Sequence, residues 1–128
     1  MKKRVYVAGK LNATACKYIK NLHTMIRQAN AVRRTGFAVF IPGMDFLAGL
    51  VCGDWAYRDF FDNSQPWLAV SDAVYVLPNW RQSKGTKREI KLARHLGIPV
   101  FFSLAQLKKA LQKTRRAKAR GVNQKGIR

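Results

Sequence analysis

Glu89 is the side chain of this sequence best placed for chemistry. It is the only glutamate among six acidic residues, in a chain that carries twenty-five lysines and arginines. It ends the segment Ser-Lys-Gly-Thr-Lys-Arg-Glu at residues 83–89, which follows the apolar run 73–77. The run is typical of a strand, and the glycine-containing segment is typical of a turn that opens a helix. Ligands of open α/β sheets bind at the carboxyl ends of the strands, so we expect Glu89 to lie at a ligand-binding edge.

Glu89 also fits a purely structural role. Thr86-x-x-Glu89 matches a capping box, in which the threonine caps the helix and the glutamate returns to the threonine N–H. Spacing alone favours this cap over a catalytic role. Lys87, Arg88 and Lys91 surround Glu89 in sequence and are expected to hold its pKa low, which suits a nucleophile better than a general acid.

Polar residues after the first three apolar runs are candidate ligand-binding residues. At the expected helix start, free N–H groups and the helix dipole would favour an anion. The segment contains neither GxxxxGK[ST] nor GxGxxG, so it is not one of the common nucleotide-binding loops. The candidate binding residues are Gly9, Lys10, Asn12, Asp45, Asn79, Trp80, Ser83, Gly85 and Thr86.

Asp72, Trp80 and Tyr6 could each have a functional role, but each also has an ordinary structural interpretation. Asp72 directly precedes a predicted strand, where a turn residue is typical. Trp80 can simply cover its loop, and Tyr6 on a doubly buried strand is expected in the core. The two cysteines and two histidines have no metal-binding spacing, so we expect no metal and no cofactor.

Short apolar runs alternate with helix-like segments along the chain. The predicted strands are residues 4–8, 37–41, 73–77 and 98–102; the predicted helices are 13–35, pieces of 44–66 broken near Gly53, 86–96, and a last helix from about 103. Mostly apolar strands alternating with helices predict an α/β fold, a Rossmann- or flavodoxin-like parallel sheet with helices on both faces. Right-handed crossovers favour the strand order 2-1-3-4, with allowance for a fifth strand.

The length of the chain and its net charge limit the number of domains and the kinds of binding partner. The 128 residues correspond to one domain, assigned to 1–119, and a basic tail at 120–128 that we expect to be flexible. A net charge of +19 indicates phosphate-bearing partners, either nucleotides or, through the tail, non-specific nucleic acid. The tail can equally be a solubilising segment. No run is long enough to span a bilayer and no signal peptide is apparent, so we expect a soluble, cytoplasmic protein without membrane contact.

Three segments together resemble a known enzyme family. They are Val5-Tyr6-Val7-Ala8-Gly9, the Gly36-Phe37 turn into the second strand, and the block from Ser71 to Glu89 with its Trp-x-x-Ser-x-Gly-x-x-x-Glu pattern. They resemble the nucleoside 2-deoxyribosyltransferase superfamily, particularly its small phage and bacterial members, over roughly residues 4–102. The resemblance implies N-glycosidic bond chemistry, in the cytoplasm of a bacterial or phage-infected cell.

The resemblance also implies roles for individual residues. The glutamate matching Glu89 attacks the anomeric carbon, and Tyr6 matches a tyrosine near that nucleophile. Members specific for phosphorylated substrates hold the phosphate on loop groups that would here be Ser83, Gly85 and the Gly9-Lys10 turn. Members usually form homo-oligomers, and an aromatic group would suit such an interface or the core equally well: Trp55, Tyr57, Phe60 and Phe61.

One departure concerns the acid that assists the leaving base. The family places an aspartate eight residues before the position of Asp72, where this chain has Ser64. Asp62 lies two residues away and is retained with Asp72 as a catalytic candidate beside Glu89 and Tyr6; Asp45 and Asp54 are alternatives to Asp62.

The expected function is an N-glycosidase of (deoxy)nucleotides or nucleosides, either a hydrolase or a 2-deoxyribosyl transferase. Two alternatives stay open. Ser64 is compatible with a protein that binds a nucleotide without cleaving it. The basic surface is compatible with a nucleic-acid-binding protein whose affinity depends steeply on salt.

Overall fold

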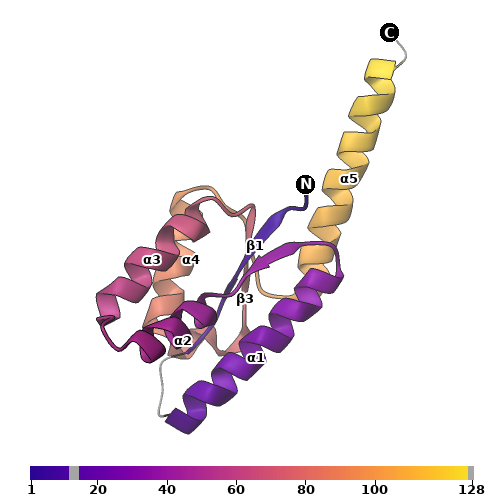
Figure 1. The fold of residues 1–128 in the computed structure, drawn as a ribbon. Coiled ribbons are helices and arrows are strands. Elements are labelled where there is room, and N and C mark those ends of the chain that lie inside the picture. Colours follow the sequence, from indigo (N-terminus) through magenta and orange to yellow (C-terminus); the bar gives the residue numbers. More distant parts are fainter. Residues whose placement is uncertain (12–14, 127–128) are drawn as a thin grey trace.

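Four parallel strands form the centre of the molecule. The computed structural model describes residues 1–11 and 15–126. Its strands are β1 (Arg4–Ala8), β2 (Ala38–Phe40), β3 (Ala73–Val76) and β4 (Val100–Phe101), and they lie in the order β2-β1-β3-β4 (Figure 1). Tyr6 on β1 pairs with Phe40 on one side and Val74 on the other. The predicted fold class and strand order are confirmed; a fifth strand does not occur within the described ranges.

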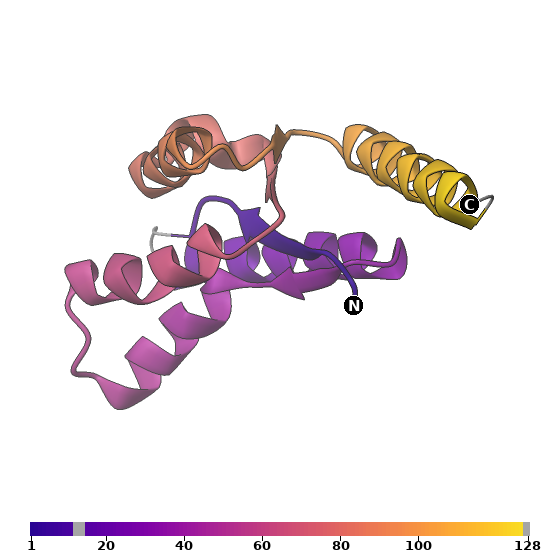
Figure 2. The same ribbon diagram turned by 90° about the horizontal axis from the view of Figure 1, so that it is seen from above.

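Helices cover both faces of this sheet. They are α1 (Ala15–Arg34), α2 (Pro42–Cys52), α3 (Tyr57–Ala69), α4 (Lys84–His95) and α5 (Leu104–Gly126), with a short 3₁₀ helix, η1 (Pro78–Gln82), before α4. Helix α1 and the start of α5 lie on one face, and α3 and α4 lie on the other (Figures 1 and 2). Their side chains form the two core clusters on these faces. None of the described helices combines the length and the apolar character that a membrane crossing requires.

Alternation along β1 explains why its sequence is apolar from Val5 to Ala8. Val5 and Val7 pack with Met25 of α1, whereas Tyr6 and Ala8 pack in the cluster on the opposite face. Successive side chains of a strand point to opposite faces, so a sheet covered on both faces needs apolar residues at every position. This double burial fixes Tyr6 beneath α3 and α4.

Glycines separate several of the elements as the sequence predicts. Gly53 has a φ of 75° and ends α2, so that the segment from 44 to 66 is indeed broken into two helices there. Gly36, with a φ of 107°, follows α1 and leads into β2.

The last helix continues past the predicted domain boundary. α5 runs from Leu104 to Gly126, so residues 120–126 of the expected tail are helical. Figures 1 and 2 show α5 as a rod that leaves the body of the domain. The division at residue 119 therefore does not coincide with a change of secondary structure.

Candidate active site

A cavity of about 360 Å³ opens among the segments that follow β1, β2 and β3. Its polar lining comes from the loop after β1, from α2 and α3, and from the start of α4. The predicted site residues that line it are Tyr6, Gly9, Lys10, Asp45, Ser83, Gly85, Thr86 and Glu89. The structure thus brings most of the predicted site together at the expected edge of the sheet.

The start of α4 differs from the capping-box interpretation. Ser83 is the N-cap: its Oγ accepts hydrogen bonds from the backbone N of Thr86 at 3.1 Å and from Thr86 Oγ1 at 2.9 Å. Thr86 is therefore inside the first turn and buried, and the predicted cap at Thr86 is wrong. Because the helix starts three residues earlier, Glu89 has no capping role and its side chain lines the cavity.

The carboxyl end of Glu89 meets the hydroxyl of Tyr6. The residue as a whole is half-buried, but Glu89 Oε2 is fully enclosed, as is the Tyr6 hydroxyl. Neither atom makes a hydrogen bond to any residue that the structure describes, although the Tyr6 hydroxyl lies close enough to favour the ionised carboxylate. Buried polar atoms are normally hydrogen-bonded, so this unsatisfied pair indicates a place for a polar ligand.

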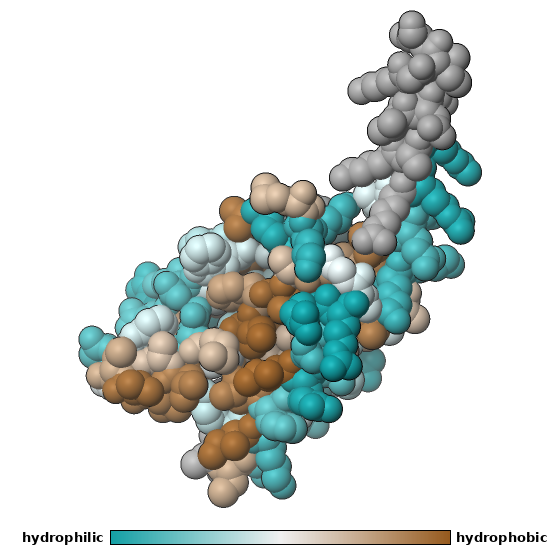
Figure 3. All heavy atoms as spheres, turned by 45° about the vertical axis from the view of Figure 1, so that its right-hand side comes forward, coloured by the Kyte–Doolittle hydropathy of each residue, from teal (hydrophilic) through white to brown (hydrophobic). Residues whose placement is uncertain are grey.

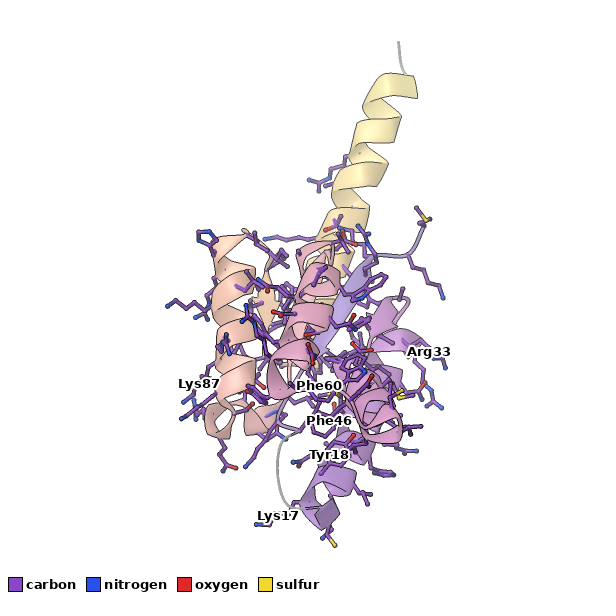
Figure 4. All side chains as sticks on the ribbon, turned by 60° about the vertical axis from the view of Figure 1, so that its left-hand side comes forward. Lys17, Tyr18, Arg33, Phe46, Phe60 and Lys87 are labelled. Carbon is purple, nitrogen blue, oxygen red and sulfur yellow. The ribbon has the colours of Figure 1, made fainter. Side chains whose placement is uncertain are left out.

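Burial sets the protonation of this pair. Loss of hydration raises the pKa of Glu89 to about 7, and the Tyr6 hydroxyl opposes the rise. The same burial, with the adjacent Glu89 charge, raises the pKa of Tyr6 well above its ordinary value. The predicted low pKa of Glu89 is wrong because burial of the carboxyl group outweighs its basic sequence neighbours. Lys87, Arg88 and Lys91 are exposed; Lys87 points away from the domain in Figure 4, and the Arg88 guanidinium lies 4.3 Å from the centroid of the Phe61 ring.

Two polar side chains approach this pair from α2 and α3. Asp45 of α2 accepts a hydrogen bond from Asn63 Nδ2 at 3.0 Å, and its negative charge contributes to the raised pKa of Tyr6. Ser64 of α3 is buried, and its hydroxyl donates a hydrogen bond to the carbonyl oxygen of Phe61 at 3.4 Å. Its proximity to the Tyr6 hydroxyl lowers the pKa of Tyr6 and so opposes part of the rise. Asp45 is therefore the second carboxylate at the cavity.

The loop after β1 brings a cation to the cavity. Gly9 is tightly packed, because a Cβ there would come within 2.5 Å of the buried Leu77 side chain. The backbone N of Lys10 donates to Asn79 Oδ1 at 3.0 Å, and Lys10 Nζ donates to Gln82 Oε1 at 3.4 Å. Asn79 therefore positions the Lys10 loop without lining the cavity itself.

The remaining candidates are not at the cavity. Asp62 is exposed and pairs with Arg58 at 3.4 Å, while Asp54 and Asp62 line a separate surface hollow. Asp72 precedes the amino end of β3 and accepts the backbone N–H of Arg4 at 2.7 Å, the structural role expected at a strand entry. Trp80 packs on Phe102 with ring centroids 5.5 Å apart and covers its loop. Asn12 lies outside the described residues.

An aromatic wall closes the other side of the cavity. It consists of Phe46, Tyr57, Phe60 and Phe61. Phe46 stacks on Phe60 with centroids 4.7 Å apart, and Tyr18 of α1 packs behind Phe46 at 4.6 Å, as Figure 4 shows. The sequence assigned most of these rings to a core or an interface, since helical spacing cannot separate a cavity wall from a core. Such a wall suits a flat aromatic ligand.

The described residues hold no group of three or more histidine, cysteine or acidic side chains that could bind a metal ion. Cys16 and Cys52 are exposed free thiols.

A comparison with protein families matches residues 3–102 to the family described as a domain of unknown function, DUF4406. The match spans all four strands and ends before α5. No curated protein matches this chain.

Proposed function

We propose that this chain, which belongs to the DUF4406 family, cleaves the N-glycosidic bond of a (deoxy)nucleotide or nucleoside, with Glu89 as the nucleophile. The observation that carries the proposal is the buried contact of Glu89 with Tyr6, two polar groups without hydrogen bonds among the described residues that face a cavity of ligand size. The resemblance of residues 71–89 to the nucleoside 2-deoxyribosyltransferase superfamily supports the same assignment.

The reaction proceeds in two displacements at the anomeric carbon. A carboxylate oxygen of Glu89 bonds to C1′ while the C1′–N bond breaks, and the base leaves with the bonding electron pair and takes up a proton. Water, or a second base in a transferase, then attacks C1′ and releases the Glu89 carboxylate. Both transition states resemble an oxocarbenium ion, whose positive charge a neighbouring carboxylate stabilises. The Tyr6 hydroxyl lies beside the carboxylate and favours its ionised form.

The raised pKa of Glu89 suits a nucleophile, but it also means that only part of the protein carries the ionised form near neutral pH. With a pKa of about 7, close to half of the carboxyl groups in the free protein are ionised near neutral pH. A poorly solvated carboxylate is a reactive nucleophile, and the developing sugar cation stabilises its charge. A nucleophilic Glu89 requires the ionised form, whereas a general acid would require the protonated form.

Asp45 is the group best placed to protonate the leaving base. It lines the cavity on α2, and Asn63 holds one of its oxygens. Asp62, the residue retained from sequence spacing, faces solvent on the outer side of α3. We therefore assign the leaving-group role to Asp45.

Phosphorylated substrates fit the cavity better than neutral nucleosides. Lys10 and Lys84 line it, and the first-turn N–H groups of α4 begin at its edge. A helix N-terminus and two cations favour a phosphate, and the aromatic wall offers a stacking surface for the base.

The test is release of free base from a panel of deoxynucleosides and their 5′-monophosphates, measured by chromatography. Wild type should release base, and Glu89→Gln should lower the rate by at least about 1,000-fold because the amide cannot form the glycosyl ester. Asp62→Asn removes a carboxylate outside the cavity and should change the rate by less than about 3-fold. If no substrate of the panel releases base, or if both variants are equally active, the proposal fails.

A second candidate is a nucleotide-binding protein without turnover, and Ser64 favours it because a carboxylate is absent from that buried position. Calorimetry separates the two: this candidate predicts binding of a nucleotide that is recovered intact. It also predicts that Glu89→Gln binds at least as tightly as wild type, since removing a buried negative charge favours a phosphate ligand.

A further inference from the structure

The helix α5 carries two opposed rows of side chains. One row, Leu104, Leu107, Leu111 and Thr114, faces the domain: Leu107 is fully buried, and Leu104 and Leu111 pack on the same core cluster. Thr114 lines a small hollow with Leu107 and Leu111. This row anchors the first half of α5 to the sheet.

The second row is the basic stripe, defined as Lys109, Lys113, Arg116 and Arg120. All four side chains are exposed. Their spacing of four, three and four residues places them on one face of a helix, and at about 100° per residue that face is opposite the leucine row. With about 1.5 Å rise per residue, the stripe is about 16 Å long.

No acidic side chain near the basic stripe in sequence offsets its positive charge. No acidic residue follows Glu89 in the sequence, and neither ion pair among the described residues involves α5. Figure 3 shows hydrophilic side chains gathered along the described part of α5, and Figures 1 and 2 show the helix leaving the domain. We propose that the basic stripe of α5 binds the phosphate backbone of double-stranded DNA.

The amino-acid composition of α5 favours double-stranded DNA over other polyanions as the partner. Single-stranded nucleic acids are bound through aromatic stacking, and α5 contains no aromatic residue. A helix that inserts into the surface of an anionic membrane buries bulky apolar side chains beside its cations, but beyond Thr114 α5 has only alanines and a single valine as apolar side chains. Duplex DNA has about one charge per 1.7 Å, and its major groove admits a helix. The groove of duplex RNA is too narrow for one.

Fluorescence anisotropy of a labelled DNA duplex of about 30 base pairs tests the proposal on the full chain, over a range of salt concentrations. The test variant replaces all four stripe residues by glutamine. A control variant of equal net charge replaces four exposed basic residues on α1 and α4 by glutamine: Lys17, Lys20, Lys91 and Arg94. Circular dichroism establishes that both variants retain the fold.

Wild type should bind the duplex with an affinity that falls steeply with salt. The stripe variant should bind about 100-fold more weakly at about 0.1 M salt, with a salt slope reduced by about two to three, and the control should lose less than about 5-fold. Equal loss in both variants would assign the binding to net charge and overturn the proposal. Stronger competition by single strands, duplex RNA or phosphatidylserine vesicles at equal charge would also overturn it. The result is independent of Glu89 and of base release.

Discussion

Replacing Glu89 by glutamine should stabilise the folded protein at alkaline pH. The ordinary pKa of a glutamate side chain is 4.5, and burial raises that of Glu89 to about 7. Between these two values the folded state binds more protons than the unfolded state, so the stability that the protonated carboxyl provides is present below pH 4.5 and is lost as pH rises through about 7. The amide of the substituted side chain is neutral at every pH and escapes this loss.

The size of the effect follows from the shift. A pKa difference of about 2.5 units corresponds to roughly 3 kcal/mol of unfolding free energy, lost in full above about pH 8. Glu89→Gln should therefore exceed wild type by roughly 3 kcal/mol at about pH 8 and match it within about 0.5 kcal/mol at about pH 4. Urea denaturation at several pH values measures both differences.

Asp62→Asn is the matched control for this experiment. It also removes a carboxylate by an isosteric change, but Asp62 is exposed and paired only with an exposed Arg58. Its effect on the unfolding free energy should stay within about 0.5 kcal/mol at every pH. The reasoning is refuted if Glu89→Gln gives no gain at alkaline pH, because the carboxyl would then be solvated or paired in the folded state.

Three further predictions concern the cavity and its surroundings. If Glu89 is the nucleophile, kcat/KM of Asp45→Asn, which lacks the proposed acid for the leaving base, should rise about tenfold per pH unit below about pH 7 and level off above it; a fall above pH 7 in this variant would instead identify Glu89 as a general acid. Ser83→Ala removes the cap of α4, so it should lower the unfolding free energy measured by urea denaturation by about 1 kcal/mol and should also weaken nucleotide binding. Ser103→Ala removes the equivalent cap of α5 and should lower the unfolding free energy without weakening nucleotide binding. The exposed apolar side chains Leu50 and Val51 of α2 favour a homo-oligomer, so Leu50→Lys should lower the mass seen by light scattering, and an unchanged mass would exclude this face.

The sheet could be predicted because its sequence signal is local. Strands buried on both faces are apolar at every position, and glycines such as Gly53 mark the helix ends, so order and layers follow from general rules of chain connection. The loop edge that carries Glu89 followed from the same reasoning. These parts of the site depend only on where each strand ends.

The protonation and the partners of Glu89 could not be predicted, because they depend on tertiary packing. Ser83 and Thr86 are both acceptable caps in sequence, and only the packed helix shows that Ser83 is used and that Glu89 turns inward. The basic neighbours of Glu89 suggested a low pKa because sequence adjacency does not reveal which side of a helix faces solvent. That Asp45 lines the cavity and Asp62 does not likewise depends on how α2 and α3 fold back at Gly53.

The helical hairpin of α2 and α3 supplies all four rings of the aromatic wall, while the Glu89–Tyr6 pair is held by α4 and β1. In the proposed enzyme, selectivity for the bound ring system and the capacity to react with it would thus be carried by different stretches of polypeptide. On this proposal, substitutions in the hairpin would change which ring is accepted and leave the reacting groups as they are.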